Sequence, residues 1–442
     1  MRNRLYRRLF LAICFAAVLP ALRAQPGDPH SRITQPAAQP QPDSVYLLRP
    51  ERVFDGEALH EGWVVLVHGR TIEAAGPAAS VHAPADAVVL DLKGATLLPG
   101  LIEGHSHLFL HPYNEVSWND QVLKESRAER TARAVVHARQ TLMAGFTTTR
   151  DLGTEGAWYD DVGLKQAIEK GVVPGPRILC ATRAIVATGS YGPKELAYDI
   201  ESPHGAAEAD GIEGITREVR TQIGKGADVI KLYADYRWGI NGANEPTFTV
   251  EEMKKAVEVA SSSGRIVAVH TGTTEGMRRA IEAGVTTIEH GDGGTPELFA
   301  AMKAKGIALC PTLAAGDAIL QYGGWKKGID PEPQRIRQKR ASFRAAMEAG
   351  VTICMGGDVG VYPHGDNARE MEMMADYGMK PIDVLRSATS VNADVFRIAK
   401  HVGRIKPGLY ADILVVEGDP TVNISQVRKI VWVMKDGVIY RP

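Results

Sequence analysis

Cysteine is scarce in this 442-residue sequence, and neither sign of charge is in excess. Three of the four cysteines (Cys180, Cys310 and Cys354) lie in short apolar runs that are typical of buried thiols. We therefore expect no disulfide framework. The formal net charge of −1 gives no indication of a nucleic-acid partner, and we expect none. With 44% hydrophobic and 23% charged residues, the composition is that of an ordinary globular protein.

The N-terminal segment differs in composition from the rest of the chain. Residues 1–24 predict a secretory signal peptide, because a basic segment, MRNRLYRR, precedes an apolar run, LFLAICFAAVLPAL, and Ala24 is a suitable last residue before cleavage. The run is too short to cross a membrane comfortably, so we expect a secreted or periplasmic protein with no membrane association after cleavage. Residues 25–43 are rich in proline, glutamine and alanine and predict a disordered linker.

Short strands separated by glycine-containing turns occur near both ends of the remaining chain. Residues 44–97 contain runs such as VYLLRPERVFDG and WVVLVHGRTIEAAG, and residues 401–442 contain ADILVVEGDP and KIVWVMKDGVIYRP. We expect these two segments to pair into one small β-sandwich domain formed from both termini.

Strand and helix signals alternate between these segments, over residues 98–400. Helical patterns lie at 122–144, 249–264, 274–284 and 388–398. The apolar strand signals lie at 97–110, 146–153, 177–185, 227–235, 265–272, 285–292, 307–313 and 351–360. Eight such strands alternating with helices predict an α/β fold of the (β/α)8 TIM-barrel type.

Polar residues stand at or near the ends of these strands, where active sites of such barrels are built. His105 and His107 are two positions apart on the first strand, so their imidazoles face the same side. Further strands supply Lys231, His270, His290 and Asp358. Imidazole and carboxylate groups suit zinc, iron or manganese. An ammonium beside metal cations is unfavourable, whereas a neutral lysine amine can react with carbon dioxide to give a carbamate anion.

This set of residues, in this strand order, resembles the two-metal form of the amidohydrolase superfamily. The stretches TTTRDLG, VYPHGDNARE and ATSVNADVF resemble its imidazolonepropionase-like and Xaa-Pro dipeptidase-like members, which include enzymes that hydrolyse ochratoxin A. The resemblance extends from about residue 45 to the C-terminus.

The resemblance implies a site with two divalent metal ions, which we expect to be zinc. It implies these ligands: His105, His107 and Asp358 for one ion, His270 and His290 for the other, and carboxylated Lys231 as the bridge. It also implies that the ions share a hydroxide, and that Asp358 takes its proton and passes it to the leaving nitrogen. Asp358 and Lys231 are therefore the predicted catalytic residues.

Several functions remain open at this point. We expect a dipeptidase or carboxypeptidase-like enzyme that acts on small molecules, either dipeptides or N-acyl amino acids, with ochratoxin A-type amides among them. The alternatives are hydrolysis of a cyclic amide, lactone or other ester at the same site, or a non-catalytic barrel that binds a ligand. Single-metal deaminases of the superfamily usually place a glutamate three residues after the strand-five histidine. Here Thr273 stands there, which favours hydrolysis over deamination.

Four residues are the main candidate substrate contacts. Tyr233 and Arg237 follow Lys231, as does Tyr236, and could bind a substrate carboxylate, Arg237 with two hydrogen bonds, although packing roles are the alternative for Tyr233 and Arg237. His364 lies in a glycine-containing loop after Asp358, and Tyr191 lies near a position where dipeptidase-like members often have a histidine. Two other histidines are interpreted as structural: His111 and His137. We also expect a homo-oligomer.

Overall fold

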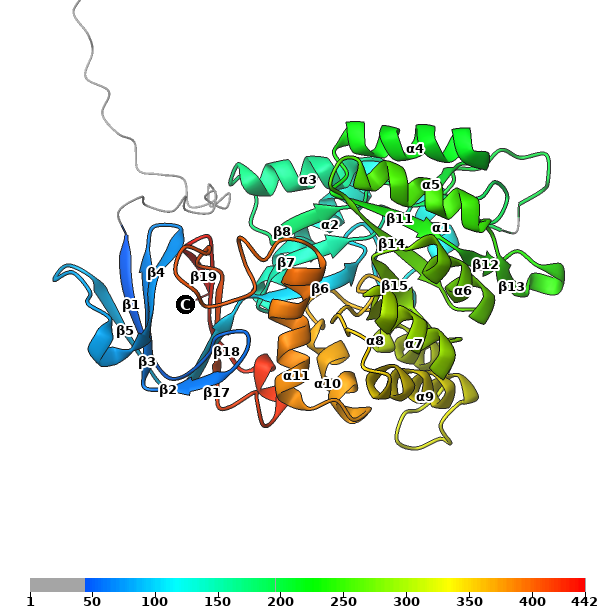
Figure 1. The fold of residues 1–442 in the computed structure, drawn as a ribbon. Coiled ribbons are helices and arrows are strands. Elements are labelled where there is room, and N and C mark those ends of the chain that lie inside the picture. The colour runs from blue at the N-terminus through cyan, green and yellow to red at the C-terminus, as the bar shows by residue number, and fades with distance from the viewer. Residues whose placement is uncertain (1–43, 195, 442) are drawn as a thin grey trace, which may run out of the picture. The chain divides into compact units, whose positions relative to one another are not determined.

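The computed structural model describes residues 44–194 and 196–441 (Figure 1). The predicted signal peptide at 1–24 and the predicted linker at 25–43 lie outside the described residues. Within the described part of the chain, no helix combines the length and the apolar character needed to cross a bilayer.

Strands from both ends of the described chain form one sheet. Its strands are β1 (Val45–Phe54), β2 (Leu59–Glu61), β3 (Trp63–His68), β4 (Thr71–Pro77), β5 (Val88–Pro99), β17 (Ile413–Glu417), β18 (Ile430–Lys435) and β19 (Val438–Arg441). The order is β19-β18-β17-β5-β1-β3-β4, with β2 paired to β1. Figure 1 shows the C-terminal strands, in red, beside the N-terminal strands, in blue.

This sheet bends back on itself around an apolar core. The amide of Ile72, in β4, donates to the carbonyl of Leu409, just before β17, at 2.9 Å. The side chains enclosed in this way include Leu48, Val65, Leu97, Val415 and Trp432. The small β domain formed from both termini is thereby confirmed, whereas the exact boundaries of the domains stay a prediction.

The barrel strands run parallel, as the alternation of strands and helices predicts. They are β6 (Leu101–Ser106), β7 (Phe146–Asp151), β8 (Arg177–Cys180), β9 (Ile185–Val186), β11 (Val229–Tyr233), β14 (Ile266–Thr271), β15 (Thr287–His290) and β16 (Ala308–Cys310). The predicted strand at 177–185 is divided into β8 and β9. Both parts adjoin β11. The backbone amide of Asp228, just before β11, donates to the carbonyl of Cys180 at 2.7 Å, and Leu232 pairs with Ile185.

The last predicted strand, 351–360, is not a regular strand. Single bridges pair Ile353 with β16 and Val359 with β6, and these close the barrel. The amide of Asp358 also donates to the carbonyl of His105 at 2.8 Å. Asp358 has a φ of +63°, a left-handed conformation that interrupts the strand pattern.

The helices that follow the barrel strands lie outside them (Figure 1). The predicted helix at 122–144 is two helices, because the side chain of Ser126 caps a new start by accepting from the amide of Glu129. The helices are α1 (Trp118–Lys124), α2 (Arg127–Met143), α3 (Asp160–Glu169), α4 (Gly211–Lys225), α5 (Val250–Ser261), α6 (Thr274–Ala283), α7 (Pro296–Lys305), α8 (Leu313–Tyr322), α9 (Gln334–Glu348), α10 (Ala368–Asp376), α11 (Pro381–Arg386) and α12 (Asn392–Val395).

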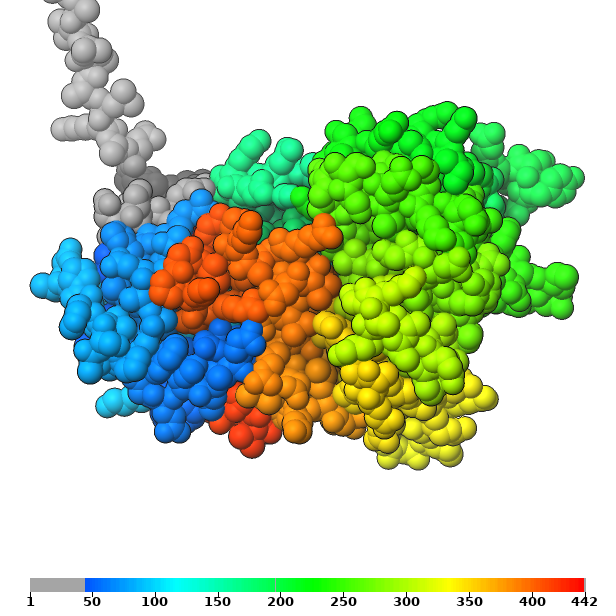
Figure 2. Space-filling view, in the orientation of Figure 1, coloured from blue at the N-terminus to red at the C-terminus, as the bar shows by residue number. Residues whose placement is uncertain are grey.

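The remaining elements are short. They are β10 (Ala207–Glu208), the hairpin strands β12 (Asp235–Arg237) and β13 (Asn244–Pro246), the 3₁₀ helices η1 (Ala78–Ser80), η2 (Ile240–Gly242) and η4 (Ile424–Arg428), and one π-helical turn at Ser387–Val391. The π-helical turn and α12 together occupy the stretch predicted as a helix at 388–398. The hydroxyl of Ser390, in this turn, donates to the carbonyl of Gly56 at 2.7 Å. Figure 2 shows this orange region in contact with the blue strands of the N-terminal part.

Gly356 is a position where barrel closure tolerates no side chain. A Cβ there would lie 2.7 Å from the amide nitrogen of His105, so the backbones of the last segment and β6 would have to separate. We predict that Gly356→Ala lowers the free energy of unfolding by about 1–3 kcal/mol or more, as overpacking does. The matched control is Gly163→Ala in α3, where space is free and alanine favours the helix by up to about 1 kcal/mol.

Urea denaturation followed by circular dichroism compares the two variants. A Gly356→Ala protein as stable as the Gly163→Ala protein would contradict the close contact between these segments.

Candidate metal centre

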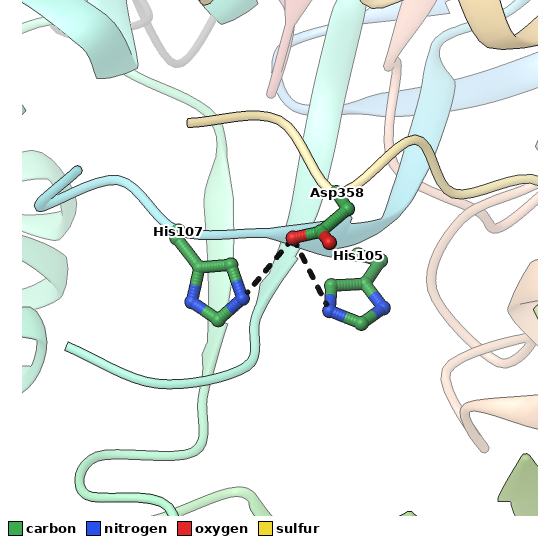
Figure 3. Close-up of side chains that lie close together, drawn as sticks. All are labelled: His105, His107 and Asp358. Carbon is green, nitrogen blue, oxygen red and sulfur yellow. Dashed lines mark ion pairs between the residues drawn. The ribbon is translucent and has the colours of Figure 1, made fainter. Parts of the chain in front are cut away.

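Three donor groups surround one point at the end of β6. The Nε2 atom of His107 lies 3.3 Å from Oδ1 of Asp358, and the Nε2 atom of His105 lies 3.6 Å from the same oxygen (Figure 3). The ligand atoms of the three residues all lie within 4.8 Å of one another. Two imidazole nitrogens and a carboxylate oxygen at this separation fit one divalent metal ion.

A second pair of imidazoles lies beside this triad. His270 ends β14 and His290 ends β15, and their ring centroids are 4.4 Å apart. The His290 ring centroid is 5.2 Å from that of His105, so the two groups are continuous.

Lys231, in β11, is buried and its Nζ atom has no hydrogen-bond partner among the described residues. A buried polar atom without a partner is costly, so this nitrogen suits chemistry that the protein atoms alone do not supply. Burial lowers the pKa of Lys231 to about 8, which favours the neutral amine that a carbamate requires. These residues fit a second ion and a bridging group.

Burial also prepares most of the imidazoles to act as ligands. It lowers the pKa of His105 and of His270 to about 4 and also holds the pKa of His290 well below its usual value, so these rings are neutral at pH 7. His107 differs. Burial disfavours its charged form, but the hydrogen bond and the charge of Asp358 raise its pKa to about 9. A metal ion would therefore displace a proton from His107.

Buried partners fix the orientation of His105. Its Nδ1 lies 2.9 Å from Oε2 of Glu289, and Oε1 of Glu289 accepts from Arg150 at 2.8 Å. Burial favours the neutral acid, but the Arg150 guanidinium holds the pKa of Glu289 well below its usual range. An ionised carboxylate on Nδ1 leaves Nε2 free to face a metal and increases its basicity.

Two other histidines are held in a similar way. His107 Nδ1 lies 2.8 Å from the carbonyl of Gly153, and His290 Nδ1 lies 2.7 Å from the hydroxyl of Thr312. Thr273, at the position where a deaminase has its glutamate, is the N-cap of α6 and accepts from the amide of Gly276. Its role here is structural.

A cavity of about 710 Å³ opens above the donor groups. Its wall includes five of the predicted metal ligands: His105, His107, His270, His290 and Asp358. It also includes three of the four predicted substrate contacts: Tyr191, Tyr233 and Arg237. Tyr191 and Tyr233 are buried and Arg237 is exposed at the mouth. The volume of the cavity is in the range of sites for small molecules, about 300–1,000 Å³.

The predicted substrate contact of His364 does not hold in this structure. His364 is buried and is not part of the cavity wall. Its ring stacks on His137 with centroids 4.3 Å apart, and its Nε2 lies 3.1 Å from the carbonyl of Leu110. The loop after Asp358 contributes Val361 to the cavity wall, whereas its histidine packs against His137 outside the wall.

Glu155 is a cavity residue that the sequence did not indicate. It lies in the loop after β7, has a φ of +50° and is only 2% exposed. Its carboxylate accepts hydrogen bonds from Trp118 and from two tyrosines of the cavity, Tyr191 and Tyr233. The sequence did contain one indication of this role. Glu155 follows the second barrel strand, at the same edge of the barrel as the histidines.

The sequence matches the Amidohydrolase family over residues 96–440. Together with the barrel and its ring of donor groups, this match shows that the chain belongs to the amidohydrolase family. It is therefore a hydrolase that acts on carbon–nitrogen bonds of small molecules. The resemblance inferred from the sequence is confirmed.

Two curated relatives and one solved structure illustrate the similarity. Ochratoxinase from Aspergillus niger is 30% identical over 377 residues, which cover 78% of this chain and 75% of the relative. Imidazolonepropionase from Chloroflexus aggregans is 25% identical over 396 residues, covering 80% and 84%. The structure of a Xaa-Pro dipeptidase with bound methionine in the active site has a TM-score of 0.79 and 30% identity, covering 90% of this chain and all of the other. The barrel fold is confirmed by this similarity.

The contact of Glu289 with His105 yields a prediction about metal affinity. In Glu289→Gln the amide no longer carries the charge that orients the ring, so we expect the affinity for zinc to fall about 10- to 100-fold. Chelator competition measures this at a temperature where the variant stays folded, because Arg150 loses its buried partner. The control is Glu282→Gln, on the surface of α6. Equal zinc affinity in both variants would refute the orienting role of Glu289.

Proposed function

We propose that the chain is a two-metal amidohydrolase that cleaves the amide bond before a C-terminal amino acid and releases that amino acid. One observation carries the proposal. His105 and His107 lie beside Asp358, a second pair of imidazoles, His270 and His290, lies next to them, and the buried amine of Lys231 has no hydrogen-bond partner among the described residues. The names of two similar proteins, ochratoxinase and a Xaa-Pro dipeptidase, support the choice of an amide substrate.

In this proposal the donor groups divide between two ions. His105, His107 and Asp358 would hold one ion, His270 and His290 would hold the other, and Lys231, as a carbamate, would supply a ligand for both. Two divalent ions, which we propose to be zinc, supply a nucleophilic hydroxide at neutral pH and polarise the substrate carbonyl.

Asp358 moves the proton. Burial favours its protonated form, but the neighbouring imidazoles of His105 and His107 lower its pKa to about 2. The carboxylate is therefore ionised at neutral pH and able to accept the proton of the attacking hydroxide. It then returns this proton to the leaving nitrogen, which departs as an amine.

The cavity orients the substrate. Arg237 lines the mouth, where its guanidinium is suited to the carboxylate of the leaving amino acid. The size of the cavity supports a dipeptide or an N-acyl amino acid as the substrate class. The signal pattern in residues 1–24 supports a secreted or periplasmic location for the reaction.

A substrate screen tests the proposal. Zinc-loaded protein is incubated with a panel of dipeptides and N-acyl amino acids, ochratoxin A included, and free C-terminal amino acid is measured. We expect release from at least one class. Hydrolysis of lactones or cyclic amides with no release from any panel member would show that the reaction is a different one.

The role of Asp358 is tested by a nearly isosteric change. Asp358→Asn keeps the size of the side chain but removes the proton acceptor, so kcat should fall about 10²- to 10⁴-fold. The metal content of the variant is measured alongside, because loss of a ligand would also slow the reaction. A variant that keeps both ions and turns over within about tenfold of the parent would show that another group moves the proton.

Lys231 is tested by removal and chemical rescue. Lys231→Ala should have no measurable activity, because no bridging carbamate can form. Formate or acetate added with zinc should restore part of the activity by replacing the missing anion. Asp358→Asn is the control, since a soluble acid does not replace a positioned proton acceptor. Full activity of Lys231→Ala without added acid would exclude the bridging role.

A further inference from the structure

The carboxylate of Glu155 lies in the wall of the cavity, and the proposed reaction does not use it. Its three hydrogen bonds all come from neutral donors. Trp118 Nε1 lies 2.9 Å from Oε2, the hydroxyl of Tyr233 lies 3.1 Å from Oε1, and the hydroxyl of Tyr191 also donates to Oε2.

These bonds determine how the tyrosines face a substrate. A phenol has a single O–H proton, and an ionised carboxylate only accepts. The hydroxyls of Tyr191 and Tyr233 both donate their proton to Glu155. Because both protons point at Glu155, the hydroxyls present only lone pairs to the cavity. Tyr233 is thus unsuited to the substrate carboxylate that its sequence position suggested.

The same tyrosines belong to an aromatic cluster. The ring centroid of Tyr191 lies 4.9 Å from that of Tyr233, 4.7 Å from that of Tyr236 and 5.0 Å from that of Trp118. Faces of such rings attract a cation, most strongly where water is excluded. The hydroxyl lone pairs and the ring faces therefore both favour a cationic ligand.

The carboxylate of Glu155 has no lysine or arginine partner among the described side chains around it. Among the described residues, no lysine or arginine nitrogen lies within 4.0 Å of its carboxylate, and the nearest ionisable nitrogen is His107 Nδ1 at 3.9 Å. Arg130 donates to the backbone carbonyl of Glu155 instead. By contrast, Asp292 in the same wall pairs with Lys339. His107 Nδ1 makes its hydrogen bond to the carbonyl of Gly153 and not to Glu155. The carboxylate of Glu155 therefore retains acceptor capacity for a cation from the substrate.

We propose that Glu155, with Tyr191 and Tyr233, forms a subsite for an ammonium group, namely the free α-amino group of a dipeptide. The proposal rests on the proposed function, which it narrows from amides in general to substrates with a free amino terminus. The position agrees with this, because the α-amino group is one carbon from the scissile carbonyl and Glu155 adjoins the metal ligand His107. Arg237, at the mouth, takes the opposite end of the dipeptide.

A matched pair of substrates tests the subsite. Alanyl and propionyl amides of the amino acid that the screen releases best differ only in the ammonium group. In the parent protein the alanyl substrate should have a kcat/KM at least about tenfold higher, which corresponds to about 1.4 kcal/mol. In Glu155→Gln the two should agree within about threefold, mainly through a higher KM for the alanyl substrate. The metal content should change little, and the ratio of the two kcat/KM values, not either rate alone, is the readout.

Two further variants separate the subsite from general effects of charge or folding. Tyr191→Phe keeps the charge and the ring but removes one acceptor, so the alanyl preference should fall part of the way. Glu245→Gln neutralises an exposed glutamate in β13, which pairs with Tyr236 in the hairpin but is not part of the cavity wall. It should keep the full preference. If Glu155→Gln does not fold, the alanyl preference of the parent protein and its decrease in Tyr191→Phe still test the subsite.

The outcomes distinguish this proposal from the proposed function. Equal rates on both substrates in the parent, or an alanyl preference that survives in Glu155→Gln, would overturn the subsite while amide hydrolysis stands. If no amide is cleaved at all, calorimetric titration of the zinc-loaded protein with alaninamide and propionamide tests the subsite alone. Tighter binding of alaninamide, lost in Glu155→Gln, supports it, and equal binding of the two amides overturns it.

Discussion

The contact that closes the barrel also assembles the site. The amide of Asp358 donates to the carbonyl of His105 at 2.8 Å, and the same residue adopts a left-handed backbone conformation. Together these place its carboxylate between the two imidazoles of β6 (Figure 3). A regular strand at this point would continue the ladder with β6 instead of turning out of it. The tight approach at Gly356, and with it the irregular last segment, is thus part of the site and not a defect of the fold.

Charge balance organises the residues around these ligands. Glu289 is paired with Arg150, and Asp292 is paired with Lys339, so both acids are ionised without a substrate. Buried imidazoles stay neutral and ready to bind a cation. Among the described residues, no lysine or arginine nitrogen lies within 4.0 Å of the carboxylate of Glu155, which also lies in the cavity wall. In the proposed complex, metals would complete one part of the site and the substrate ammonium group would complete the other.

The sequence predicted the elements whose signals are local. Strand and helix periodicity was sufficient for the barrel, and the spacing of His105 and His107 was sufficient to predict that they face the same side. It could not predict features that depend on contacts between distant segments. His364 packs on His137 instead of lining the cavity. The roles of Glu289 and Glu155 depend on partners from other strands and loops, and no local pattern distinguishes them from ordinary acidic residues.

The central claim is that six residues of the barrel hold two metal ions through a modified lysine. Crystals of zinc-loaded protein, with anomalous data collected at the zinc edge, test it most directly. We expect two peaks per chain about 3.5–4 Å apart, one beside His105, His107 and Asp358 and the other beside His270 and His290. Density for a carboxylate on Lys231 should lie between them. A single peak, or an unmodified Lys231 in fully active protein, would contradict the account.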